Sequence, residues 1–280
     1  MNVIYDIIDM CLPFAWLEPT FMKNAFLAVL VAAPLFGGLG SFVVSNNMAF
    51  YSDAIGHSAL TGIALGIILG IKNPILSMVV FSLLLGCAII TVKTKGKTSA
   101  DTIIGVFSSA AVALGLVLLS ATGNFAKYQK YLVGDILSIQ PSEIALLLVV
   151  ALLVIIIWTL FYNKMLLTNM HRTFAKSRGV SVFFIEQLFA LTTALIVAVS
   201  IHWTGLLVIN SLLVLPAAAA RLVTRSSRSY VLTSVLISLL SSVIGLIISY
   251  YWDSVSGATI VLVNTVAFVV CLILGSLRKK

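Results

Sequence analysis

The sequence predicts an all-α protein that crosses a lipid bilayer about eight or nine times. The chain has 280 residues, of which 61% are hydrophobic and 9% are charged. Its mean hydropathy is +1.16, whereas roughly a quarter of the residues in soluble proteins are charged. Apolar runs of about 20 residues, each long enough to span the hydrocarbon core, recur from one end to the other. We therefore expect one polytopic transmembrane domain over residues 1–280 and no separate soluble domain.

Nine apolar segments account for the predicted helices, and polar or basic stretches separate them. The seventh segment is the weakest, because it contains a proline near its end; it is either a full crossing or a partial, re-entrant helix. An odd number of crossings places the two termini on opposite sides of the membrane. The predicted segments are 20–44, 46–70, 74–92, 102–121, 143–162, 181–201, 205–220, 230–251 and 257–277.

Residues 1–19 are predicted to form an amphipathic segment that lies on the bilayer surface before the first span. They carry Asp6, Asp9 and Glu18, where a signal peptide would carry positive charge. The three cysteines of the chain are odd in number and far apart. This pattern indicates neither a disulfide framework nor a zinc site.

Basic residues predict the orientation of the chain. If successive loops alternate between the two sides, 13 of the 17 lysines and arginines lie on one side, in the stretches 93–97, 164–178, 221–228 and 278–280. Such an excess marks the cytoplasmic side. We therefore expect the C-terminus in the cytoplasm and the N-terminus outside. The net charge of +8 is thereby explained by membrane topology, and no nucleic-acid partner is expected.

The strongest candidate for a functional site is the stretch NNMAFYSDAIGHSALTG, residues 46–62. It places Asp53 and His57 four residues apart, about one helical turn, so both side chains leave the same face of a helix. Ionisable groups inside a membrane span are rare and usually functional. A carboxylate with an imidazole suits Zn²⁺, Mn²⁺ or Fe²⁺. The alternative is a buried Asp–His pair that only fixes helix packing.

A second cluster runs from His202 to Arg228. Pro216 is predicted to end the regular helix, and a short cytoplasmic helix from Ala217 to about Thr224 would then dock on a partner and transmit force. We assign this coupling role to the segment 217–229. The alternative is an ordinary span end with arginines on the cytoplasmic side. The residues proposed for coupling are Pro216, Ala217, Ala218, Ala219, Ala220 and Arg221.

Three more polar residues are candidates for the metal pathway. His202 lies near the predicted outer boundary and would be an entrance ligand or a support for the ligands. Asn210 lies in the middle of an apolar segment. Asp253 is either a carboxylate at the outer mouth or simply a loop residue. The stretch 91–98 superficially resembles a phosphate-binding loop, but it lacks the first glycine and follows an apolar helix instead of a strand. We therefore predict no ATP site and no enzymatic activity in this chain.

At these residues the chain resembles the permease subunits of bacterial ABC importers for zinc, manganese or iron. Four blocks carry the resemblance in the family's order, and together they cover nearly the whole chain. One departure concerns the basic pair that often precedes the Asp-His motif in the family, where this chain has Asn46-Asn47. The four blocks are GGLGSFVVSNNMAFYSDAIGHSALTGIALG, ADTIIGVFSSAAVALGLVLLS, YLVGDILSI and TGLLVINSLLVLPAAAARLV.

The resemblance implies a function, partners and a location. Such permeases form homodimers in the bacterial inner membrane, bind two cytoplasmic ATPase subunits and receive metal from an extracytoplasmic binding protein. By motif, Asp53 and His57 would be metal ligands on the pathway, and the Pro216–Thr224 segment would meet the ATPase. No permanently bound cofactor is implied, only transported Zn²⁺ or Mn²⁺, with Fe²⁺ as a further candidate. The alternative function is a metal carrier or channel driven by an ion gradient without an ATPase, since buried Asp and His residues also serve as proton relays.

Overall fold

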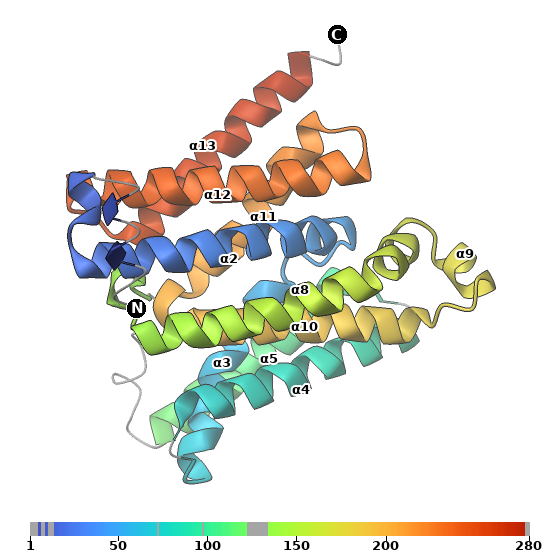
Figure 1. Ribbon diagram of the computed structural model, residues 1–280. Coiled ribbons are helices and arrows are strands. Elements are labelled where there is room, and N and C mark those ends of the chain that lie inside the picture. Colours follow the sequence, from blue (N-terminus) through green and yellow to red (C-terminus); the bar gives the residue numbers. More distant parts are fainter. Residues whose placement is uncertain are drawn as a thin grey trace. The chain divides into compact units, whose positions relative to one another are not determined.

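The computed structural model describes residues 5–6, 9–10, 14–71, 73–96, 98–121 and 134–277. Within these residues the chain is helical and contains no strand (Figure 1), which confirms the all-α prediction. One long helix overlaps each of the nine predicted apolar segments. These helices are α2 (Thr20–Ser45), α3 (Tyr51–Ile68), α4 (Pro74–Lys95), α5 (Ala100–Ala121), α8 (Pro141–Met170), α10 (Val182–Thr204), α11 (Leu206–Val223), α12 (Ser227–Trp252) and α13 (Ser256–Leu277). Three short helices, η1 (Ala15–Leu17), η2 (Ile136–Ser138) and α9 (Arg172–Ser177), complete the description. Nine residues of the predicted surface segment 1–19 lie outside the described residues, so its placement on the bilayer surface stays a prediction.

Seven of the nine long helices are long and apolar enough to cross a membrane: α2, α4, α5, α8, α10, α12 and α13. An eighth, α11, has a shorter apolar part, Val208–Val223. The remaining helix, α3, has only 18 residues and includes Asp53 and His57, which lower its hydropathy. A helix of that length spans about 27 Å, slightly less than the hydrocarbon core of about 30 Å. The membrane-protein class is confirmed, and the orientation of the termini stays a prediction.

The predicted single domain divides into two compact units built from interleaved stretches of chain. Unit 1 comprises Met1–Ser41, Val133–Val149 and His202–Lys280. Unit 2 comprises Phe42–Leu132 and Val150–Ile201. The boundaries fall inside α2, α8 and α10.

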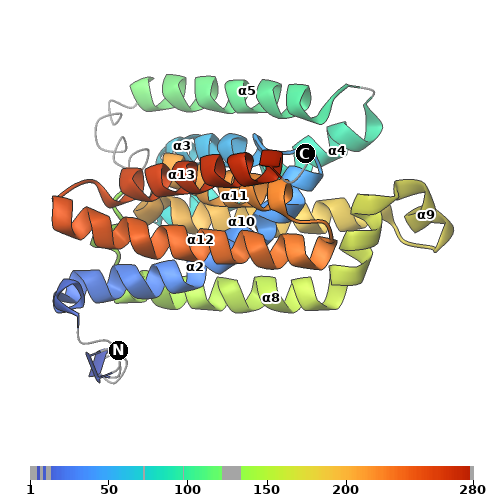
Figure 2. The ribbon, with the colours of Figure 1, turned by 90° about the horizontal axis from the view of Figure 1, so that it is seen from above.

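In unit 1, helices α11, α12 and α13 pack against one another (Figure 2). Small residues bring α2 close to this group. The Ser234 hydroxyl of α12 donates a hydrogen bond to the Gly37 carbonyl of α2 at 2.6 Å. One turn further on, the Ser238 hydroxyl donates to the Ala33 carbonyl at 2.7 Å. Such contacts replace the hydrophobic driving force that is missing between helices in lipid.

Pro216 does not end its helix, so the prediction of a separate short helix after it is wrong. Helix α11 continues through Pro216 to Val223. Proline is tolerated inside membrane helices when neighbouring groups compensate for the lost backbone bond. The four alanines that follow it are the strongest helix formers. The helix ends where Thr224 donates its N–H, at 3.1 Å, and its hydroxyl, at 2.7 Å, to the Ala220 carbonyl.

The segment 217–229 therefore consists of the end of α11, a three-residue link and the start of α12. The Ser226 hydroxyl caps α12 by accepting the Ser229 N–H at 3.3 Å, as expected for an N-cap serine. The coupling role proposed for this segment thus belongs to a connection between two long helices.

Helix α8 is longer than predicted, because it runs through Lys164 to Met170. The basic residues of this stretch predict a loop there. Methionine, leucine and lysine are all good helix formers, and a lysine stem lies along apolar surface while its charge stays in water. The helix consequently continues past the apolar run.

Candidate metal site

A tight turn delivers the chain from α2 into α3. Asn47 adopts a left-handed backbone conformation with φ 54°, which asparagine accepts more readily than most residues. The Met48 N–H then bonds the Val43 carbonyl at 3.0 Å. The Asn46 side chain donates to the Phe42 carbonyl at 2.9 Å. This turn separates the helices of the predicted segments 20–44 and 46–70.

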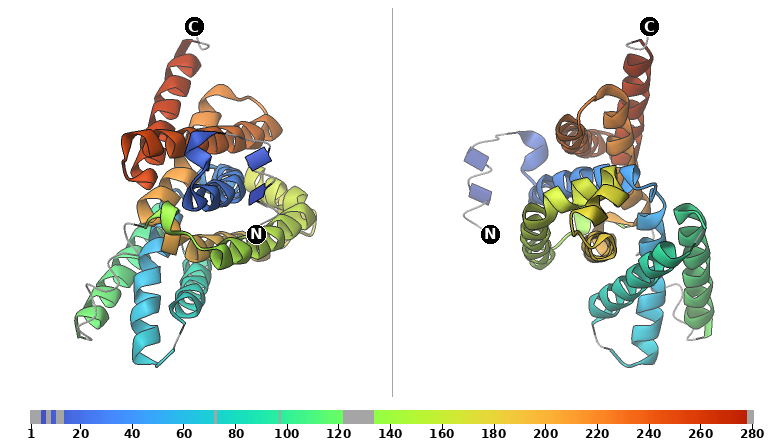
Figure 3. Two further views of the ribbon diagram at one scale, coloured as in Figure 1. Left: turned by 60° about the vertical axis from the view of Figure 1, so that its left-hand side comes forward. Right: turned by 90° about the vertical axis from the view of Figure 1, so that its right-hand side faces the viewer.

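Helix α3 lies between α4 and α5 in unit 2 (Figure 3). A Cβ added at Gly62 would lie 2.8 Å from the Ser77 carbonyl of α4, so glycine permits this close approach. The Ser58 and Ser82 hydroxyls share a hydrogen bond of 3.2 Å between α3 and α4. The Thr61 hydroxyl donates to the Ala111 carbonyl of α5. Glycine and hydroxyl contacts thus fix α3 tightly on two sides.

Asp53 and His57 lie on the face of α3 opposite Gly62 and Gly66. Asp53 precedes Gly62 by nine residues, and His57 precedes Gly66 by the same number, which is about two and a half turns. The Asp53 side chain is 37% exposed and that of His57 28% exposed. The helix packs through its glycine face and leaves the two candidate ligands accessible.

The spacing of the pair suits two ligands of one ion. His57 Nε2 lies 3.5 Å from Asp53 Oδ1. Hydrogen bonds of this type usually measure about 2.7–3.2 Å. Two ligands about 2.1 Å from a tetrahedral Zn²⁺ are about 3.4 Å apart. The predicted side-by-side placement on one helix face is therefore found, at a distance that an ion could bridge.

The pair supplies only part of a coordination shell. Over the described part of the chain, no group of three or more histidine, cysteine, aspartate and glutamate side chains could hold a metal ion. Two protein ligands bind a metal weakly, and a transport site must release its ion. Further ligands would have to come from water, from other residue types or from another molecule.

The remaining candidates, His202, Asn210 and Asp253, belong to unit 1. Asn210 is half-buried in α11. Asp253 is exposed and ends α12 in a left-handed conformation with φ 50°. Asp253 therefore ends a helix, and a role for its carboxylate at the outer mouth stays a prediction.

His202 has a partner that the sequence analysis missed. Its Nδ1 lies 2.6 Å from Glu143 Oε1, and the side chains are 30% and 16% exposed respectively. The other Glu143 oxygen accepts the Gln140 N–H at 2.9 Å at the start of α8. The two residues are 59 positions apart, so no local pattern could pair them. A role for His202 on the pathway stays a proposal.

We expect the His202–Glu143 pair to stabilise unit 1. In a double-mutant cycle with His202→Gln and Glu143→Gln, the coupling energy should be about 1 kcal/mol. Thermal unfolding of the detergent-purified protein measures it. If either single variant instead weakens metal uptake without changing the melting temperature, His202 acts on the pathway.

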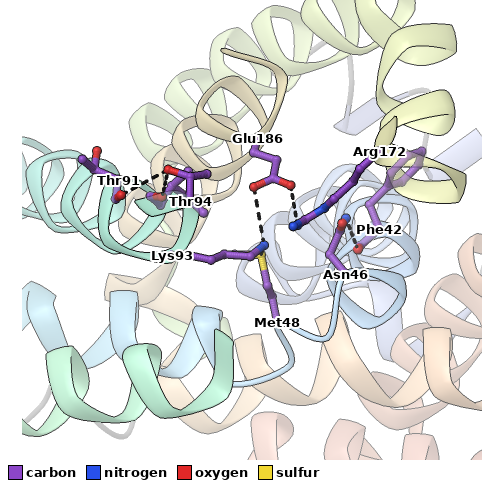
Figure 4. A network of polar contacts seen from close by, with 9 residues as sticks. Phe42, Asn46, Met48, Thr91, Lys93, Thr94, Arg172 and Glu186 are labelled. Carbon is purple, nitrogen blue, oxygen red and sulfur yellow. Dashed lines mark hydrogen bonds and ion pairs between the residues drawn. The ribbon is translucent and has the colours of Figure 1, made fainter. Parts of the chain in front are cut away.

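A buried charged cluster lies elsewhere in unit 2. The Glu186 carboxylate of α10 is 7% exposed; its Oε1 lies 2.5 Å from Arg172 Nη2 and its Oε2 3.7 Å from Lys93 Nζ. Figure 4 shows the two cations approaching the carboxylate from different elements, α9 and α4. Glu186 is not among the predicted site residues, although it is the only acidic residue in the segment 181–201. An ionisable group within an apolar segment is itself a functional signal.

The fold and the pair on α3 define the class of this protein: a polytopic helical membrane protein with a carboxylate–imidazole pair on a helix inside the bundle. The chain belongs to the ABC 3 transport family, whose model matches residues 18–275.

Two relatives and one solved structure carry the comparison further. The chain is 32% identical over 260 residues to the "High-affinity zinc uptake system membrane protein ZnuB" of Haemophilus influenzae, covering 92% of this chain and 97% of that protein. It is 31% identical to the "Manganese import system permease protein ScaB" of Streptococcus gordonii, covering 89% of this chain and 90% of that protein. The structure of "PsaBC from Streptococcus pneumoniae in complex with Fab" matches with a TM-score of 0.79 and 27% identity, covering 97% of this chain and 95% of that chain.

Proposed function

We propose that this chain is the membrane permease subunit of an ATP-driven importer for a divalent transition metal in the bacterial inner membrane. The observation that carries the proposal is the Asp53–His57 pair, 3.5 Å apart on the accessible face of α3. The ABC 3 family match over residues 18–275 supplies the class of transporter.

The proposed cargo is Zn²⁺ or Mn²⁺, with Fe²⁺ as a further candidate. Asp53 offsets part of the charge of the ion in a medium of low dielectric constant, where an uncompensated charge is costly. Neutral His57 adds a nitrogen ligand of intermediate softness, which suits all three metals. The relatives include one named for zinc and one named for manganese, so both ions stay in the proposal.

A second copy of the chain would complete the ligand set. We propose a homodimer, which the resemblance to the permease family implies. Because a two-fold axis repeats each residue, two copies together offer two carboxylates and two imidazoles. Four such ligands match the number that zinc prefers.

The energy for uphill transport would come from a separate ATPase subunit. The stretch 91–98, which resembles a phosphate-binding motif, lacks the first glycine of that motif. The proposed contact is the segment 217–229, which connects α11 and α12 and includes Arg221. ATP binding and hydrolysis in the partner would move this connection, and the metal delivered by an extracytoplasmic binding protein would pass along α3. We also propose that the binding protein docks directly on the outer face of the permease.

The test is metal uptake into proteoliposomes with and without the ATPase subunit. We expect uptake only when the permease, the ATPase subunit, ATP and metal-loaded binding protein are all present, because a bound ion must be moved by a conformational change that ATP drives. Liposomes with a non-hydrolysable ATP analogue are the control. Uptake by the permease alone under an ion gradient would contradict the proposal and favour the gradient-driven carrier.

A further inference from the structure

The first turn of α3, which carries Asp53, is held at a junction with two other helices of unit 2, α4 and α10. The Tyr51 side chain is fully buried, and its hydroxyl donates to the Ala190 carbonyl of α10 at 3.0 Å. A Cβ at Gly86 of α4 would lie 2.5 Å from the same hydroxyl oxygen. The start of α3 is therefore fixed by contacts with both neighbouring helices.

Polar side chains also tie α4 and α10 to each other. The Gln187 amide of α10 donates to the Cys87 carbonyl at 3.1 Å and to the Thr91 hydroxyl at 3.0 Å, both on α4. Lys93 of α4 and Glu186 of α10 form an ion pair at 3.7 Å, and each of these side chains is only 7% exposed. The junction that receives α3 thus contains a buried pair of opposite charges.

Lys93 also reaches the turn that precedes α3. Its Nζ atom lies 3.2 Å from the Met48 sulfur, and Figure 4 shows it between that sulfur and the Glu186 carboxylate. Met48 is 1% exposed, and its carbonyl accepts the Tyr51 N–H at 2.9 Å. Asp53 follows two residues later. A shift of Lys93 would therefore reach Asp53 through one side-chain contact and a single turn of backbone.

A buried ion pair is a costly way to join two helices. Taking two charges out of water carries a desolvation penalty that their attraction offsets only in part, and apolar side chains of similar volume often give equal or greater stability. The positive-inside rule explains an exposed lysine such as Lys95, but it does not explain one that is 7% exposed. Arg172 adds a second cation to Glu186 at 2.5 Å, but its side chain is 55% exposed. The burial of Lys93 therefore indicates a role beyond membrane topology.

We propose that the Lys93–Glu186 pair positions the metal site, because it holds the turn before α3 and thereby the spacing between Asp53 and His57. The inference rests on the proposed function and assigns positioning residues to its metal site. Asp53 belongs to the first turn of α3 and His57 to the second, so a change in the first turn alters their separation of 3.5 Å. Ligands must be held within roughly 0.5 Å of their productive geometry, so a small shift of this turn is enough to impair the site.

The chemistry of lysine explains why a charged pair serves here. An ammonium group carries three N–H donors, so Lys93 contacts the Met48 sulfur while it is attracted to Glu186. Glu186 fixes the ammonium in place, and the ammonium fixes the turn. Lys93→Met would fill much of the same space but would remove every donor.

The test compares metal uptake with ATP hydrolysis in liposomes that contain the permease, the ATPase subunit and metal-loaded binding protein. In Lys93→Met/Glu186→Gln the net charge is kept, and the exposed Arg172 stays solvated. We expect metal transported per ATP hydrolysed to fall about tenfold or more, as when other supports of metal ligands are lost. The melting temperature and the rate of ATP hydrolysis should stay near those of the wild type, because no charge is left buried alone.

Two further variants separate positioning from a general loss of charge. Lys95→Met removes an exposed lysine two residues further along α4, and its effect on the ratio should be within about threefold. Lys93→Met/Asn46→Lys returns a cation to the same place, because Asn46 and Glu186 line the same small cavity of about 20 Å³ as Lys93. This variant should transport clearly more metal per ATP than Lys93→Met alone, which leaves Glu186 paired with Arg172.

The outcomes are distinct. An unchanged ratio in Lys93→Met/Glu186→Gln would overturn the positioning role, and so would an equal fall in Lys95→Met. A lower melting temperature, with uptake and hydrolysis reduced in proportion, would show that the pair only joins α4 to α10 and would overturn the role too. If Lys93→Met/Glu186→Gln does not fold, the Asn46→Lys comparison decides, and no recovery overturns the role. If the wild type takes up no metal with ATP, the proposed function itself fails.

Discussion

Metal uptake is expected to fall about 100-fold or more when Asp53 and His57 are replaced together by asparagine and glutamine. Loss of groups that merely support a ligand already costs about 10- to 100-fold in metal affinity, and here the ligands themselves are lost. Both replacements keep the size and polarity of the original side chains, so α3 should remain packed between α4 and α5. Uptake of radioactive metal by cells that lack other importers measures the effect.

Glu18→Gln is the control for this variant, because Glu18 is an exposed carboxylate outside the long helices. It should transport as wild type. Each single variant, Asp53→Asn or His57→Gln, should lose most of the uptake on its own, since a weak site has no ligand to spare. Full metal-dependent growth of the double variant, at normal expression, would show that the pair only serves helix packing.

The second large effect is a loss of thermal stability in Gly115→Ala. A second glycine of the same helix, Gly105 of α5, provides the control substitution. A Cβ at Gly115 would lie 2.6 Å from the Thr61 hydroxyl oxygen and 3.1 Å from the Thr61 backbone nitrogen of α3. Overpacking of this kind typically costs about 1–3 kcal/mol, and here it would also push on the helix that carries the metal ligands. Gly115→Ala should therefore lower both the melting temperature and the uptake.

Gly105→Ala, on the same helix, should leave both unchanged or slightly raise the melting temperature. Among the residues that the structure describes, no atom lies within 4 Å of a Cβ at Gly105, and alanine is the better helix former. Thermal unfolding of the two variants in detergent, followed by the loss of the monodisperse peak in size-exclusion chromatography, compares them directly. Similar melting temperatures for both variants would contradict the close α3–α5 contact.

Local patterns predicted much of this architecture. Apolar run length placed all nine helices, because a bilayer demands a fixed number of apolar residues per crossing. The four-residue spacing placed Asp53 and His57 on one face, because side chains one turn apart project the same way. Gly62 permits a close approach of α3 to α4, as small residues often do between membrane helices.

Other features could not be predicted from local sequence patterns. They depend on contacts between residues far apart in the sequence, or on neighbouring residues that offset a helix-breaking proline. Pro216 was predicted to end a helix, but four following alanines carry α11 on to Val223. Glu143 and His202 meet only because α8 begins where α10 ends in unit 1. Glu186 stands out in the sequence as the one acidic residue of an apolar segment. Its partners are distant in the sequence, Lys93 by 93 positions and Arg172 by 14, so only the three-dimensional structure shows the contacts.

The most direct test of the central claim follows ATP hydrolysis and metal uptake together in liposomes that contain the permease and its ATPase subunit. Metal-loaded binding protein would be added to the wild type and to the Asp53→Asn/His57→Gln variant. The account predicts that loaded binding protein stimulates hydrolysis in both complexes, and that metal enters only the wild-type liposomes. Uptake that persists in the variant, or uptake by the permease alone under an ion gradient with no ATPase bound, would contradict an ATP-driven pathway along α3.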